Sequence, residues 1–464
     1  MWRYYTAIIV ALFECASLLW SANAAASHDL FTTEKFLASG PFAATSEVCP
    51  KDRIQRKLTL ADVVELALCN NPQTRALWAS SRAQAAQLGT TMSSYLPTLS
   101  GPISVSGTRS TVAGVTTDSR QKSIGLTVSY LLYDFGGRAA GVENAKQLLV
   151  AANASRDETL QTVFLTAIQS YYTLLSARAS MQSFTAAEAA ARESLNAAQA
   201  RYQAGTGIPA DRLQAQTALS QAVLNRIRAE GEAVNAQGSL ASIMGFDATQ
   251  PFELAQVPEI TPDPVVEQDI GKLIEQARHS RPDLIAAEAQ IKAAEAQVRA
   301  TNANGLPSFT LNGSAVKLQS SANASAGYSQ SLTLAVSVPW FSGYRDTYQN
   351  RIAQAQLEGK VADRDRVANQ IALEVWNAYQ VLLTNSQALR AADDLLASAT
   401  QSEKVVSGRY KAGLGSILDV LSAQSALANA QQQRVTALYH FQASRFTLTQ
   451  AIGQLDLTLL GTKN

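Results

Sequence analysis

The spacing of apolar residues changes several times between a helical and a strand-like period. From Leu60 to Thr91 apolar side chains recur every three or four positions, as on one face of a helix. After Leu96-Pro97 the period falls to two, through Ile124, Leu126, Val128, Tyr130 and Leu132. Beyond Gly137 the helical period returns. The pattern predicts a helix, a strand pair at 98–133, a long helix at 137–204 and a further helix at 209–244.

The second half of the chain repeats this succession. Arg201-Tyr202-Gln203-Ala204-Gly205 recurs as Arg409-Tyr410-Lys411-Ala412-Gly413, and Leu96-Pro97 recurs as Leu306-Pro307. We therefore predict one structural unit used twice, at 59–250 and 268–453, joined by a linker at 251–267 and followed by a tail at 454–464. The predicted elements of the second unit are a helix at 268–302, a strand pair at 308–340, a long helix at 343–412 and a helix at 417–452.

The two longest helices exceed what a compact domain can bury. A helix of ~68 residues is ~100 Å long, at 1.5 Å per residue. Only 7% of residues are aromatic although 47% are hydrophobic, and alanine makes up the difference. These proportions favour closely packed bundle or coiled-coil helices over thick globular domains.

The N-terminal residues 1–26 have the features of a secretory signal peptide. Arg3 precedes an apolar stretch, and Ala22-Asn23-Ala24 offers a small-residue cleavage site. An N-terminal extension at 27–58 follows. Cys49 and Cys69 would then meet an oxidising compartment and could form a disulfide, although a buried, unpaired Cys69 explains the sequence equally well.

Each predicted strand has about the ten residues that cross a bilayer when tilted. Leu332, Leu334 and Val336 alternate with Thr333 and Ala335, which suits a sheet between lipid and a lumen. A soluble sheet with one wet face gives the same alternation, but the signal peptide and the long helices favour the membrane. Four strands cannot close a barrel, so several chains would share one.

Charge and motifs argue against other classes of protein. Lys and Arg number 38 and Asp and Glu 37, which does not favour nucleic-acid binding. His28, His279 and His440 lie far apart, outside any metal-ligand spacing. The sequence also contains neither a phosphate-binding loop nor a Gly-x-Ser-x-Gly motif. We predict no enzymatic activity, cofactor or metal.

The chain resembles the TolC-like outer-membrane factor family over nearly its whole mature length. The resemblance rests on the duplicated order of elements, the two Leu-Pro pairs, the sequence from Tyr133 to Arg138 and the two Arg-Tyr-x-Ala-Gly motifs. It implies a mainly α fold with a shared transmembrane β-barrel: a homotrimer whose 12-stranded barrel lies in outer-membrane lipid and continues into a periplasmic α-helical barrel. The implied partners are a periplasmic adaptor (membrane fusion) protein and an inner-membrane RND or ABC transporter.

The resemblance places the glycine-containing turns at the periplasmic tip, where the adaptor would bind. The residues concerned here are Gly205, Thr206, Gly413 and Leu414. Glycine permits the positive φ that a sharp reversal after a helix requires, so a plain turn is the alternative interpretation.

The resemblance also suggests a constriction at the tip. Asp419 matches a carboxylate that lines the closed aperture, Tyr410 a residue that ties neighbouring helices, and Asp211 is the repeat partner of Asp419. A first-turn Asp that stabilises its own helix is the simpler interpretation of Asp419. Ser422 and Gly415 depart from an aspartate and a latching arginine of some members.

The implied function is a passive outer-membrane exit channel of a tripartite export system, opened at its periplasmic end by the adaptor and the pump. The cargo would be small molecules in efflux or polypeptides in type I secretion. A non-conducting periplasmic coiled-coil scaffold or adaptor is the alternative.

Overall fold

The computed structural model describes residues 29–37, 57–255, 269–321 and 326–455. They belong to two compact units, whose boundaries cut through the long helices. The first unit comprises residues up to Ser39, Ala79–Asn153 and Ala286–Arg364, and the second comprises Gly40–Trp78, Ala154–Ile285 and Asp365–Asn464. Cys49 and the signal peptide lie outside the described residues.

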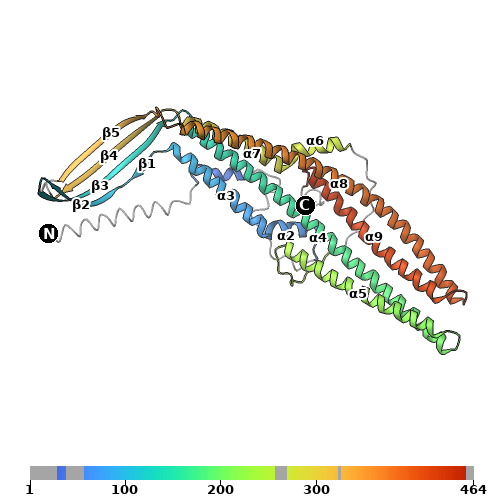
Figure 1. Cartoon of the computed structure of the whole chain (residues 1–464). Coiled ribbons are helices and arrows are strands. Elements are labelled where there is room, and N and C mark those ends of the chain that lie inside the picture. The colour runs from blue at the N-terminus through green and yellow to red at the C-terminus, as the bar shows by residue number, and fades with distance from the viewer. Residues whose placement is uncertain (1–28, 38–56, 256–268, 322–325, 456–464) are drawn as a thin grey trace. The chain divides into compact units, whose positions relative to one another are not determined.

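The first unit contains one antiparallel sheet (Figure 1). Its strands are β1 (Thr98–Ser100), β2 (Ile103–Val112), β3 (Val115–Tyr133), β4 (Ser308–Ser320) and β5 (Ala326–Ser337). β1 and β2 pair with successive parts of β3, and β4 pairs with β3 and with β5. The sequence predicts four strands, whereas the structure has five, because Gly101-Pro102 divides the first one. Pro cannot donate a ladder hydrogen bond, which explains the break.

The two faces of this sheet differ in chemistry. Cross-strand neighbours on one face are apolar, with Tyr130 opposite Leu311 and Leu311 opposite Leu334. On this face Leu332 and Leu334 are 77% and 61% exposed, and Tyr130 and Leu311 are half-buried. On the other face Ser129 Oγ donates to Asn312 Oδ1 at 2.8 Å, and the hydroxyls of Ser314 and Ser331 lie 2.8 Å apart. One face is therefore mainly apolar, interrupted by Lys317 and Gln330, and the other is a polar ladder.

A fixed turn joins β3 to the long helix α4 (Gly137–Gln203). Phe135 and Gly136 have positive φ angles of 52° and 92°. The Arg138 guanidinium donates to the carbonyl oxygens of Leu131 at 2.7 Å and Leu132 at 3.1 Å, and its backbone N–H donates to Asp134 Oδ2 at 2.7 Å. The motif from Tyr133 to Arg138 thus satisfies the last strand carbonyls and the first helical N–H groups together.

The helix that precedes each strand pair is interrupted, where the sequence predicts a continuous one. The first divides into α2 (Leu60–Asn70) and α3 (Pro72–Met92), and the second into α6 (Ile270–Ser280) and α7 (Pro282–Ala303). Asn71 and Arg281 lie between them with ψ angles of 128° and 123°. Both precede a proline, whose ring excludes the preceding residue from the helical region.

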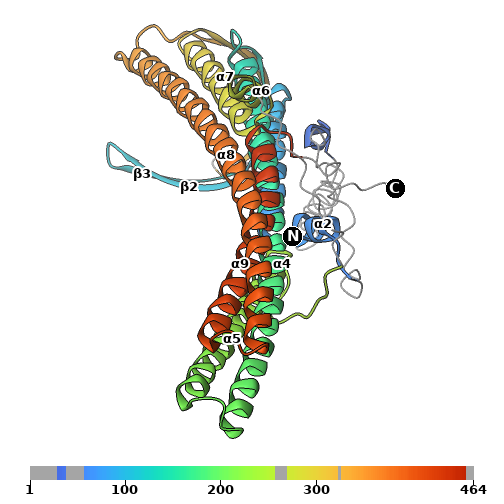
Figure 2. The same cartoon turned by 90° about the vertical axis from the view of Figure 1, so that its right-hand side faces the viewer.

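Two helical hairpins dominate the second unit. The C-terminal part of α4, from Ala154, is followed by α5 (Pro209–Ile243), and the C-terminal part of α8 (Arg345–Lys411), from Asp365, is followed by α9 (Ile417–Ala451). Figures 1 and 2 show α5 running back along α4 and α9 along α8. The first hairpin carries an ion pair from Arg226 Nε to Glu188 Oε2 at 2.6 Å, and the second one from Arg434 Nε to Asp393 Oδ1 at 2.9 Å. The Arg226 hydrogen bond lowers the pKa of Glu188.

The main core of the second unit lies where α2, α4 and α5 meet. Its fully buried members include Val63, Phe164 and Leu240. A second cluster packs α6 against α8 through Leu273, Ile371 and Val375. In the first unit the 3₁₀ helix η1 (Thr33–Leu37) packs Leu37 against Leu88 and Leu149. No helix in the described part of the chain is apolar over a length sufficient to cross a membrane.

Candidate functional site: the tips of the helical hairpins

The two hairpin turns have the same backbone hydrogen bonds. In the first, Thr206 N donates to Arg201 O at 3.0 Å and Gly205 N to Tyr202 O at 3.1 Å. In the second, Leu414 N donates to Arg409 O at 2.9 Å and Gly413 N to Tyr410 O at 3.0 Å. This pattern is the Schellman motif, which needs a left-handed residue. Gly205 and Gly413 supply it, with φ angles of 72° and 78°.

The four predicted tip residues are presented to the outside of the single chain. Gly205, Thr206, Gly413 and Leu414 are all exposed, and the apolar Leu414 side chain is 73% exposed. Ile208 and Leu418, at the starts of the returning helices, are 59% and 54% exposed. Each turn therefore carries an uncovered apolar side chain beside polar backbone groups.

Asp419 lies at the start of α9 and stabilises that helix. It forms a capping box with Ser416, whose backbone N–H donates to Asp419 Oδ2 at 3.4 Å. Its side chain is exposed. Asp211 occupies the same position in α5. The residue before that helix is Ile208, whose apolar side chain cannot accept the hydrogen bond that a capping box requires. The capping role is thus present at Asp419.

Tyr410 is the one predicted constriction residue that is buried, and it connects the two hairpins. Its ring packs with Ile417 and Val420. The Arg201 guanidinium carbon lies 4.1 Å from the centre of that ring, and Arg201 Nη2 donates to the Tyr410 carbonyl oxygen at 2.7 Å. Arg201 was not among the residues predicted for the tip. The signal that identifies it was available, because Arg-Tyr is repeated at both turns.

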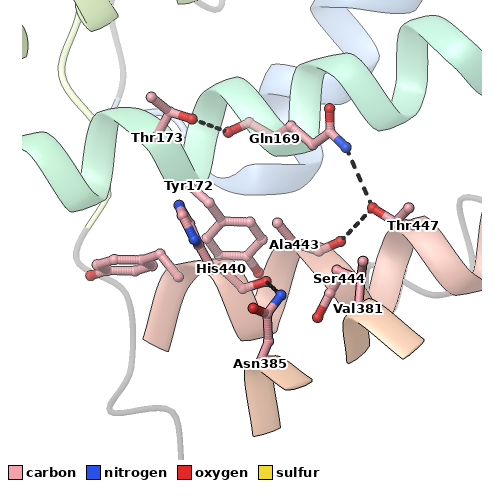
Figure 3. Close-up of a pocket in the computed structure, with 10 residues that line it drawn as sticks. Gln169, Tyr172, Thr173, Val381, Asn385, His440, Ala443, Ser444 and Thr447 are labelled. Carbon is pink, nitrogen blue, oxygen red and sulfur yellow. Dashed lines mark hydrogen bonds between the residues drawn. The ribbon is translucent and has the colours of Figure 1, made fainter. Parts of the chain in front are cut away.

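A second tie between the hairpins lies further from the tip. The buried Ser194 Oγ of α4 donates to Gln424 Oε1 of α9 at 3.1 Å. Still further from the tip, Gln169 Nε2 of α4 donates to Thr447 Oγ1 of α9 at 3.4 Å beside a pocket of about 380 Å³ (Figure 3). Tyr172 and His440 also line this pocket, which separates α4 from α8 and α9.

A cluster of charged residues lies in the second unit where α6 meets α7. Arg281, which is 5% exposed, forms ion pairs with Asp283 at 2.6 Å and with Glu374 of α8 at 2.8 Å. Burial raises the pKa of Glu158, a residue of α4, and the negative charges of Asp283 and Glu374 add to this effect. The cluster holds three carboxylates to one guanidinium and connects three helices.

The structure describes only one of the two cysteines of the predicted disulfide. Cys69 is disulfide-bonded, and Cys49 lies outside the described residues, so their pairing stays a prediction. Among the residues that the structure describes, no group of His, Cys, Asp or Glu side chains could hold a metal ion.

The duplicated order of helix, strand pair and long hairpin, together with the two-faced sheet, defines a class of outer-membrane export channels. The chain belongs to the outer membrane efflux protein family, whose model matches residues 63–246 and 273–454. Members of this family are channel proteins of the outer membrane rather than enzymes, and the channel interpretation is confirmed over the periplasmic scaffold.

Three similarities illustrate the match. Protein CyaE of Bordetella pertussis is 29% identical over 412 residues, covering 88% of this chain and 86% of its own length. Outer membrane efflux protein BepC of Brucella suis is 24% identical over 407 residues, covering 87% of both chains. The crystal structure of the CmeC outer membrane channel of Campylobacter jejuni has a TM-score of 0.75 at 19% identity and covers 87% of each chain.

Proposed function

We propose that this chain is the exit duct of a tripartite export system and that three copies form it. The two-faced sheet is the observation that carries the proposal. Its apolar face suits lipid and its polar ladder suits a water-filled lumen. In the order of the described strands, β5 and the β1–β2 strand lie at the two ends, so each has a neighbour on one side only. Open edges are not tolerated in lipid, and neighbouring copies would pair them into a 12-stranded barrel.

In this proposal the long hairpins of the three copies form a helical barrel in the periplasm. The uncovered tip residues Gly205, Thr206, Gly413 and Leu414 meet the hairpins of a periplasmic adaptor protein, which connects the duct to an inner-membrane RND or ABC transporter. The duct uses no energy source and no cofactor of its own. The cargo is small molecules or a secreted polypeptide.

Conductance of the purified protein in planar lipid bilayers tests the duct. We expect discrete channel events from the detergent-extracted oligomer, with the closed tip keeping the conductance small. Reconstituted oligomer that shows no channel events under any voltage or salt condition would contradict the proposal. Heat-denatured protein at the same concentration is the control for detergent artefacts.

We further propose that Asp419 lines the constriction of the closed tip, where three copies would face one axis. Like charges at close range repel each other and attract cations. Asp419→Asn removes the charge but keeps an oxygen that accepts the Ser416 N–H, so the helix cap survives. We expect a higher conductance and weaker block by multivalent cations. Asp211→Asn is the matched control in the other repeat, and equal behaviour of the two variants would place the constriction elsewhere.

A further inference from the structure

The charged side chains of the sheet are distributed unevenly between its two faces. The described strands contain four basic residues and one acidic residue, and the register places all five on the apolar face: Arg109, Arg120, Lys122, Lys317 and Asp118. Arg109 donates to both carboxylate oxygens of Asp118, at 2.7 Å and 2.9 Å, so these two charges neutralise each other. The polar face carries uncharged groups instead, such as the hydroxyls of Ser104 and Ser123, 2.7 Å apart. Three positive charges therefore remain on the apolar face.

The three remaining cations form one cluster at the end of the apolar face that lies away from α4. Lys317 is the register partner of Ile124, two positions from Lys122 on β3, so the two lysines are diagonal neighbours with Cα atoms ~7–8 Å apart. Arg120 lies two positions beyond Lys122, or ~7 Å along the same strand. All three are exposed, and none forms an ion pair or a side-chain hydrogen bond with the residues that the structure describes.

Apolar side chains border this cluster directly. Val105 is the register partner of Lys122 and is 74% exposed, and Ile124, the partner of Lys317, is 48% exposed. On the other side of Lys317 lies Tyr328 of β5, which is 66% exposed. A ligand at this end of the face would meet cations and an apolar surface together.

The position of the cluster suits the boundary of a lipid layer. From Lys122 to Leu132 β3 advances ten positions. This is ~33 Å along the strand, or ~25 Å along the membrane normal at a tilt of ~40°, which is the usual height of the apolar band of an outer-membrane barrel. At the other end of the band Tyr133 packs against Phe135, with ring centres 4.8 Å apart, as aromatic residues do at a membrane interface. The cations then lie at the level of the lipid headgroups, where lysine is tolerated.

We propose that Arg120, Lys122 and Lys317 bind the phosphate groups of a membrane lipid whose acyl chains lie along the adjoining apolar face. Clustered basic side chains attract anionic headgroups, and a guanidinium can donate two hydrogen bonds to one phosphate. The neighbouring apolar side chains favour a lipid over free phosphate. The inference rests on the proposed function in placing this face in lipid. With the helices in the periplasm, the cluster lies in the outer leaflet.

Binding of lipid to the detergent-solubilised oligomer, measured by native mass spectrometry, tests the proposal. With dioleoyl phosphatidic acid as the probe, Lys122→Gln with Lys317→Gln should weaken binding at least ~10-fold. Lys122→Arg with Lys317→Arg, which keeps both charges, should retain the binding. Dioleoylglycerol, which has the same acyl chains and no phosphate, should bind equally weakly to all three proteins. Equal binding of phosphatidic acid to the unchanged chain and to the glutamine double variant would overturn the proposal.

Two controls separate the site from general charge and from free phosphate. Lys404→Gln with Lys411→Gln removes two exposed lysines of α8, outside the sheet, and should leave the binding of phosphatidic acid unchanged. A loss as large as that of the sheet variant would overturn the site. Millimolar inorganic phosphate should not displace the lipid, and displacement would overturn the lipid as the occupant.

Planar-bilayer recordings of the same proteins distinguish this proposal from the proposed function. The glutamine double variant of Lys122 and Lys317 should still produce channel events. Channel events together with unweakened binding of phosphatidic acid in that variant would contradict the lipid site alone. An unchanged chain that produces no channel events would contradict the duct instead.

Discussion

Single glycines fix the ends of the helices in this protein, and their surroundings differ. Gly245 and Gly453 close the C-terminal ends of α5 and α9, with φ angles of 79° and 74°. A Cβ atom on Gly245 would lie 2.7 Å from Asn70 O, and one on Gly453 would lie 2.9 Å from the Ser280 carbonyl carbon. Gly205 and Gly413 have similar φ angles, but a Cβ there meets open space. All four positions require glycine for its positive φ angle, and Gly245 and Gly453 require it also because a neighbouring backbone leaves no room for a Cβ atom.

We predict that Gly245→Ala lowers the free energy of unfolding by at least ~2 kcal/mol, because left-handed strain of ~1 kcal/mol and overpacking of ~1 kcal/mol or more add together. Gly205→Ala carries only the strain and should cost ~1 kcal/mol. Thermal unfolding of the two variants, followed by circular dichroism, compares them. Equal losses would mean that the approach of Asn70 to Gly245 relaxes without cost.

At the scale of elements, the break at each proline creates a place where three helices meet. In the second repeat this junction carries the buried Arg281 with Asp283 and Glu374. The corresponding position in the first repeat is Asn71, whose Oδ1 caps the next helix through the N–H of Gln73 at 2.8 Å. The same backbone geometry thus uses a neutral cap in one repeat and a buried ion pair in the other.

Arg281→Met should lower the free energy of unfolding by up to ~3 kcal/mol at neutral pH, because it leaves the partly buried carboxylates of Asp283 and Glu374 without their cation. Burial and neighbouring carboxylates already raise the pKa of Glu158 above its ordinary value of 4.5. A raised carboxyl pKa means that the folded state binds the proton more tightly, so stability falls as the pH rises through that pKa. The loss in the variant should therefore shrink toward pH 4–5.

Urea unfolding at pH 5 and pH 7 measures this effect. Arg278→Met is the matched control, since Arg278 forms an exposed pair with Glu275 in the same helix at 46% and 60% side-chain exposure. Exposed pairs of this kind contribute at most ~1 kcal/mol. A loss in Arg281→Met that does not depend on pH would show that packing, rather than charge, explains the role of Arg281.

At the scale of the whole molecule, export depends on contacts that the tips make with other proteins. We predict that Leu414→Glu abolishes export while the oligomer stays intact, because a charge replaces an exposed apolar side chain at the proposed adaptor contact. Export from cells that produce the variant, and gel migration of the unboiled protein, measure the two properties. Val405→Glu, on an exposed part of α8 away from the turn, is the control. Export that survives in Leu414→Glu would place the adaptor contact elsewhere.

Much of the architecture was predictable because periodicity acts locally. A period of two marked the strands, a period between three and four marked the helices, and the repeat showed that both occur twice. The helix breaks at Asn71 and Arg281 were not predicted, although Pro72 and Pro282 follow them in the sequence, because the apolar pattern continues across both positions. The division of the first strand was missed for a similar reason, because Gly101-Pro102 interrupts the hydrogen bonds and leaves the alternation intact.

The sequence by itself determined the order of elements, because period and repeat are properties of the chain alone, and its motifs indicated the class of protein by resemblance to a known family. It also identified Gly205, Gly413 and Asp419, whose backbone roles depend on neighbours within a few residues. Only the tertiary structure decided which side chains meet across the hairpins. Arg201 and Tyr410 are far apart along the chain, and their contact depends on how two long helices pack. Such packing reflects many weak contacts summed over whole helices, which no short motif encodes.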